Sequence, residues 1–233
     1  MGAPRAIALC ACFDGALEYQ AGHWEAAEAA LRESIRLHRE IGAASGEALA
    51  CQRLGVLLTG RGRLDEAQTV LDEGLVVAER ALLRAHCLTR LYAALARNRL
   101  VAGDLLAADQ ALAQGLAMSR RHGHCTTCNA LLLPAAVGVR AAQRDWEAAE
   151  AFCRQLDAAA VEYGSRTWQA MARQARGELA ASQGQRDEAL ASYTAAQTAF
   201  SLAGNLAEAE RCLNAITALT RPGAGDREVR EPT

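Results

Sequence analysis

The string WEAAEA occurs twice in this chain, at residues 24–29 and again at residues 146–151. The separation of 122 residues divides into three steps of 40 to 41, and each step reaches a comparable alanine. With one more alanine a step further on, the series is Ala27, Ala67, Ala108, Ala149 and Ala189. A fixed period of this length is typical of stacked small units, none of which can bury its apolar face alone. The repeat therefore predicts one elongated domain built by stacking.

Other positions of each unit keep their character relative to the alanine. Mostly small residues stand twelve positions before it, at Gly15, Gly55, Ala96, Val137 and Gly177. Mostly apolar residues stand four positions after it, at Leu31, Leu71, Leu112, Cys153 and Tyr193. A turn segment separates the two halves, usually with a glycine that can take the left-handed conformation at a helix end. The pattern predicts two antiparallel helices per unit, which approach closely where the facing residues are small.

We therefore expect an all-α solenoid of about five antiparallel helix hairpins with a C-terminal capping helix. The expected units span residues 5–42, 43–80, 81–122, 124–163 and 165–203, and the cap spans 205–219. One side of the cap repeats apolar residues that should cover the last hairpin, namely Leu206, Ala209, Leu213, Ile216 and Leu219. Residues 220–233 are polar and without periodicity, so we expect a disordered tail outside the 5–219 repeat domain.

The repeat pattern resembles the tetratricopeptide repeat (TPR). In the first unit, Gly15 and Ala27 stand twelve apart, an apolar residue follows four positions on, and a small one follows seven positions on. The units exceed the family's usual length of about 34 residues and lack its proline. In this they resemble the repeat regions of bacterial LuxR-type, ATP-dependent transcription regulators. The resemblance implies a right-handed superhelix whose concave groove, lined by the first helix of each unit, binds a protein or peptide.

Six polar or charged residues are candidates for partner binding in that groove: Gln52, His86, Arg90, Arg97, Gln174 and Glu178. Among them His86, Arg90 and Arg97 lie at helical spacing, which predicts a basic stripe suited to an acidic side chain or a C-terminal carboxylate. We expect both arginine side chains to be exposed. The competing interpretation is that they are solvated arginines without a ligand.

Composition bears on other function classes. All 25 basic residues are arginine and the net charge is -2, so no general field attracts nucleic acid or an anionic membrane. A phosphate-binding Walker loop needs a lysine, and no serine stands in a Gly-x-Ser-x-Gly frame. The longest apolar run, residues 130–139, is about half a membrane span. We expect a cytoplasmic, regulatory adaptor that is not an enzyme and needs no cofactor.

The pair Cys125 and Cys128 has the Cys-x-x-Cys spacing that lets two sulfurs meet across one helical turn. A redox pair is one interpretation, because the start of a helix favours thiolate. A zinc site with His122 and His124 is a second, although four ligands within seven residues strain a tetrahedron. We expect the third, that both cysteines pack as small side chains without metal or unusual reactivity. A thiol redox or metal sensor acting through this pair is thus the alternative to the binding scaffold.

Overall fold

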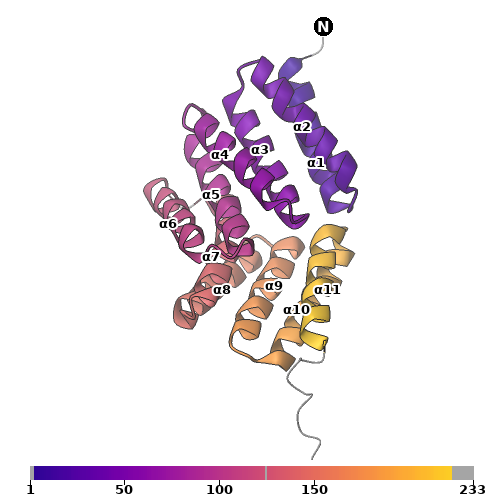
Figure 1. Cartoon of the computed structure of the whole chain (residues 1–233), viewed down its shortest axis with the longest axis vertical. Helices are drawn as coiled ribbons and strands as arrows, with labels where there is room; N and C mark the ends of the chain where they lie inside the picture. The colour runs from indigo at the N-terminus through magenta and orange to yellow at the C-terminus, as the bar shows by residue number, and fades with distance from the viewer. Residues whose placement is uncertain (1–2, 124, 222–233) are drawn as a thin grey trace, which may run out of the picture.

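The computed structural model describes residues 3–123 and 125–221, and these ranges contain α-helices and no strand. These ranges form eleven helices, which follow one another along a curved array in Figure 1. Their bounds are α1 Pro4–Gln20, α2 Trp24–Glu40, α3 Ala44–Gly60, α4 Leu64–Ala78, α5 Arg84–Val101, α6 Leu105–Arg121, α7 Thr126–Ala142, α8 Trp146–Glu162, α9 Arg166–Ser182, α10 Arg186–Leu202 and α11 Leu206–Thr220. The predicted all-α solenoid of five hairpins and a cap is confirmed.

The turn inside each hairpin places one residue in the left-handed region of the backbone. Glycine holds this position in four hairpins, for example Gly103 with φ 80°. In the hairpin of α7 and α8 the residue is Arg144, with φ 61°. A side chain is disfavoured in that conformation. The Asp145 side chain accepts a hydrogen bond from the Ala148 backbone N–H and caps α8, and this contact helps to hold the turn.

Inside the hairpins, the two helices approach closely where the small residue twelve positions before the repeated alanine meets the apolar residue four positions after it. A Cβ added at Gly55 would lie 2.4 Å from Cδ2 of Leu71, so only glycine fits opposite that leucine. In the fourth hairpin the sizes are exchanged, because Val137 shares a core with the smaller Cys153 and both are fully buried. Such volume-conserving exchanges are tolerated in cores, which explains how this unit departs from the glycine pattern.

The hairpins stack so that their first helices contact one another: α1 packs on α3, α3 on α5, α5 on α7 and α7 on α9. Each second helix also packs on the first helix of the next hairpin. The second helices therefore lie on the outside of the curve, as α2, α4, α6 and α8 do in Figure 1. Within the described ranges no helix is both long and apolar enough to cross a membrane.

The cap α11 packs on α10 and also contacts α1, at the opposite end of the chain. The expected apolar face of this helix is partly wrong, because Leu206 and Leu213 are 50% and 51% exposed. Ala209 is buried as expected, and Ile216 and Leu219 pack against the core, but Ala207 and Cys212 are buried in place of the two leucines. Small residues face inward because α11 lies close to two helices. Thr220 still belongs to α11, and residues 222–233 of the expected tail lie outside the described residues.

Candidate ligand-binding cavity

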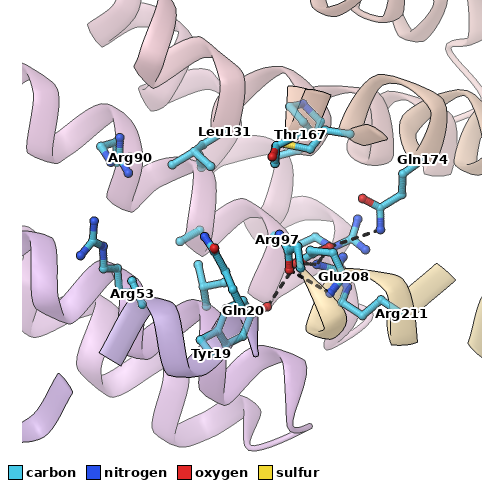
Figure 2. A pocket seen from close by; sticks show the side chains of 18 of the residues that line it. Tyr19, Gln20, Arg53, Arg90, Arg97, Leu131, Thr167, Gln174, Glu208 and Arg211 are labelled. Carbon is cyan, nitrogen blue, oxygen red and sulfur yellow. Dashed lines mark hydrogen bonds and ion pairs between the residues drawn. The ribbon is translucent and has the colours of Figure 1, made fainter. Parts of the chain in front are cut away.

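A cavity of about 360 Å³ lies on the concave side of the array. All five first helices and α11 contribute to its walls (Figure 2). Its apolar lining includes Val56, Leu131, Pro134, Trp168 and Met171. Its charged lining consists of Arg53, Arg90, Arg97, Arg211, Glu178 and Glu208. The cavity thus combines apolar walls with more arginines than carboxylates.

At the cap end of the cavity, the two carboxylates are paired with arginines. Arg97 Nη1 lies 2.8 Å from Glu178 Oε1, and Arg211 Nη1 lies 2.8 Å from Glu208 Oε1. The Tyr19 hydroxyl donates to Glu208 over 3.2 Å, which joins α1 to α11. Figure 2 shows Tyr19, Arg97, Glu208 and Arg211 converging there. The charges at this end neutralise one another, and the contact between Tyr19 and Glu208 links α1 to α11.

The ionisation of Glu208 is set by this network. Burial alone would raise the pKa of its carboxyl, but the charges of Arg211 and Arg97 and the hydrogen bonds to the carboxylate outweigh burial. The pKa of Glu208 is therefore below its usual value. Conversely, the charge of Glu208 raises the pKa of Arg211. Glu208 is therefore negatively charged at neutral pH, and its contacts with Arg211 and Tyr19 stabilise the fold.

The other end of the cavity holds two arginines without a carboxylate partner among the described residues. Arg53 donates from Nη1 to the Cys12 carbonyl over 2.8 Å and places its Cζ 4.7 Å from the centre of the Phe13 ring. Arg90 makes no ion pair, and its buried Nε has no hydrogen-bond partner within the described chain. Burial, then the nearby charge of Arg53, lowers the pKa of Arg90. This end, which Figure 2 shows around Arg53 and Arg90, carries an uncompensated positive charge.

Five of the six predicted groove residues line this one cavity: Gln52, Arg90, Arg97, Gln174 and Glu178. Two expectations about them are wrong. Arg90 and Arg97 are half-buried rather than exposed, and Arg97 is ion-paired with Glu178 instead of belonging to a free basic stripe. The reason is that α9 crosses the groove opposite α5 and brings a carboxylate to Arg97.

The sixth residue, His86, does not line the cavity and lies instead against the predicted cysteine pair. Its Nδ1 is 3.0 Å from Cys128 Sγ and 3.8 Å from Cys125 Sγ. The two sulfurs are 2.9 Å apart. Cys128 is buried, as expected for a packing residue, but Cys125 is exposed. His124, one of the histidines considered for a zinc site, lies outside the described residues.

Sequence reasoning missed Arg53, Glu208 and Arg211. Arg53 directly follows Gln52, a predicted groove residue, and this adjacency in the sequence was the available signal. Nothing in the local sequence of α11 indicates that Glu208 faces α1, because that contact joins residues 189 positions apart. Such contacts depend on how strongly the whole array curves.

Comparison with known proteins supports the fold. No family model matches the chain, and no curated protein matches it by sequence. A solved Rap protein, complexed with competence and sporulation factor, has a TM-score of 0.66 and 11% identity, over 94% of this chain and 65% of that one. The protein BtubC (BKLC) from P. vanneervenii has a TM-score of 0.54 and 18% identity, over 94% of this chain and 98% of that one. The chain thus spans 65% of the length of the Rap protein and has its TPR-like helical-repeat fold.

Proposed function

We propose that this chain is a binding module that holds a peptide, or a segment of a partner protein, in the concave cavity. An acidic group of the ligand lies at the end of the cavity that contains Arg53 and Arg90. The observation that carries this proposal is Arg90, a half-buried cation that lines the cavity, whose buried Nε has no hydrogen-bond partner and which has no counter-charge among the described residues. We also propose that this module has a regulatory or adaptor role in a bacterial signalling or transcription-control system, without catalysis.

The electrostatics favour an anionic group. Removing a guanidinium from water without a counter-charge is unfavourable, and burial has already lowered the pKa of Arg90. A carboxylate between Arg53 and Arg90 would offset that desolvation and accept charge-assisted hydrogen bonds from both. Gln52, whose buried Oε1 has no partner in the part of the chain that the structure describes, offers an acceptor in the same cavity for a ligand N–H.

The size and walls of the cavity define the rest of the ligand. A volume of about 360 Å³ is at the lower end of the range for small-ligand sites, so only a few residues of a partner enter. Leu131, Trp168 and Met171 give these residues an apolar surface. We therefore infer an acidic residue or a free C-terminus next to an apolar side chain. The Rap protein of the same fold, solved with competence and sporulation factor, supports the use of this fold for binding.

The test begins with a library of short peptides selected on the purified chain. The best peptide is then compared by calorimetry with a copy whose carboxylates are amidated. We expect amidation to weaken binding by about tenfold or more, since hydrogen bonds between charged groups contribute about 1.5–3 kcal/mol. Arg90→Met should cause a similar loss, because methionine keeps the apolar stem without the charge.

The matched control is Arg99→Met, which changes the same residue type in the same helix but outside the cavity lining. Its affinity should equal that of the wild type. Selected peptides without any carboxylate, or equal affinities for wild type and Arg90→Met, would contradict the proposed site.

A further inference from the structure

We propose that His86, Cys125 and Cys128 form a binding site for a soft, thiolate-seeking d10 metal ion, Zn²⁺ or Cu⁺. The site lies outside the cavity lining, although Arg90 of the cavity is close enough to act electrostatically on His86 and Cys128. From the sequence alone we expected no metal at the cysteine pair. The imidazole of His86, which comes from α5, changes that expectation because it turns the pair into a three-ligand cluster.

The geometry of the three ligand atoms suits one ion. Cys125 Sγ and Cys128 Sγ are 2.9 Å apart, and His86 Nδ1 lies 3.0 Å from the second sulfur and 3.8 Å from the first. In a tetrahedral zinc site, Zn–S bonds of about 2.3 Å and Zn–N bonds of about 2.0–2.1 Å set the ligand atoms about 3.5–3.8 Å apart. The sulfurs and the nitrogen therefore need to separate by less than about 1 Å, which small side-chain rotations provide.

The fold holds these ligands in place through two elements. Cys125 is the N-cap residue of α7 and Cys128 lies in its first turn, where the Cys128 backbone N–H donates to the Cys125 carbonyl over 3.0 Å. His86 is in the first turn of α5. The two helices share a core that includes Ala93 of α5 and Leu132 of α7. Because the core fixes α5 against α7, the three ligands are brought together before any ion binds.

The ligand types decide which ions fit. Two sulfurs and an imidazole prefer zinc or monovalent copper, whereas magnesium and calcium prefer oxygen ligands. The cluster lies at a recess of about 460 Å³ that also includes His122 and Met118. His122 is exposed and lines that recess, and Met118, which also lines it, carries a thioether, a ligand type that monovalent copper accepts.

Access and contacts favour a metal over simple packing. Cys128 is 1% exposed while Cys125 is exposed, so an ion can arrive from solvent and bind against a buried ligand. The Nδ1 atom of His86 faces both sulfurs and lies within hydrogen-bond distance of the Cys128 thiol, so the three ligand atoms already converge on one point. A disulfide would use the two sulfurs but would leave the imidazole without a role.

The experiment uses the full chain, purified without metal and kept reduced. Cobalt(II) is added first as an optical probe, because its spectrum reports thiolate bonds and a tetrahedral field. Zn²⁺ and Cu⁺ are then titrated separately, without oxygen, against chromophoric chelators. We expect one equivalent of cobalt with thiolate charge-transfer bands, and tight 1:1 binding of zinc or copper. The titration identifies which of these two ions binds more tightly.

Three variants, Cys125→Ser, Cys128→Ser and His86→Ala, should each weaken binding by more than about 100-fold, since even second-shell changes cost about 10–100-fold. Cys10→Ser is the matched control, because Cys10 is also an exposed free thiol but lies on α1. It should bind like the wild type. As a measurement that needs no variant, bound metal should protect two cysteines of the wild type from alkylation.

The proposal is overturned if the reduced wild type binds neither zinc nor copper at one equivalent. It is equally overturned if His86→Ala, shown to be folded by circular dichroism, binds metal as tightly as the wild type.

Discussion

The two ends of the cavity contain the same side chain, arginine, in opposite electrostatic environments. At the cap end, Arg97 and Arg211 are each 2.8 Å from a carboxylate oxygen of the chain. At the other end, Arg53 and Arg90 have no carboxylate partner among the described residues. Half-buried arginines therefore have two different roles in this cavity. The paired arginines hold the array closed, whereas the unpaired ones are available to an anionic ligand.

The largest effect should come from breaking the paired end. Glu208→Gln keeps the shape of the side chain but leaves Arg211 half-buried without its counter-charge and weakens the Tyr19 contact. We expect the free energy of unfolding to fall by about 1–3 kcal/mol, the usual cost of an unsatisfied buried polar group. Urea unfolding followed by circular dichroism measures it. The control is Glu150→Gln, whose arginine contacts of 3.5 and 3.6 Å are at the surface and should change stability by less than about 0.5 kcal/mol.

Acid should remove the same stabilisation without a mutation. The pKa of Glu208 is lowered in the folded chain, so its contribution is complete above the unfolded-state pKa, about 4.3. That contribution is lost as the pH falls through the folded pKa. The stability difference between wild type and Glu208→Gln should therefore be constant from pH 7 to about 5 and shrink below about 4.3. A difference that is constant down to pH 3 would mean that Glu208 gains nothing from its arginines.

A smaller effect of opposite sign is expected at the unpaired end. Arg90→Met removes a desolvated charge and keeps an apolar stem of similar length. Replacing such a charge is often neutral or stabilising, so we expect stability to be unchanged or to rise by up to about 1 kcal/mol. The same urea titration measures this. A loss of more than about 1 kcal/mol would show that Arg90 is structural and that the two ends do not differ as described.

The smallest expected effect is the coupling between the ends. Arg90 shares no hydrogen-bond or ion-pair partner with Glu208 among the described residues. Arg97, whose charge acts on Glu208, is seven residues from Arg90 in α5, about 10 Å by the helical rise. Sites at this separation usually add within about 0.3–0.5 kcal/mol. The double variant Arg90→Met with Glu208→Gln should therefore equal the sum of the single variants within that margin. A larger coupling energy in this double-mutant cycle would mean that the cavity responds as one network.

Much of the fold was predictable because its causes are local. Small residues at the positions of Gly55 and Ala67 recur with fixed spacing in most units, and they let the two helices of a hairpin approach closely. The departures were also local: Val137 replaces the glycine where Cys153 replaces the leucine. The candidate site was predictable only in part. Gln52 and Arg90 follow from the side of the first helix that faces the groove, but whether an arginine there is paired depends on a different unit.

The sequence by itself determined the hairpins, their turns and the concave side of each first helix, because residues within about 40 positions of one another decide these features. Tertiary structure alone decided that α11 reaches α1 and that Glu178 neutralises Arg97. Each of these contacts depends on small rotations between neighbouring hairpins, which add up along the array. A repeat pattern specifies one unit and its neighbour, whereas the curvature summed over five hairpins sets which distant side chains come together.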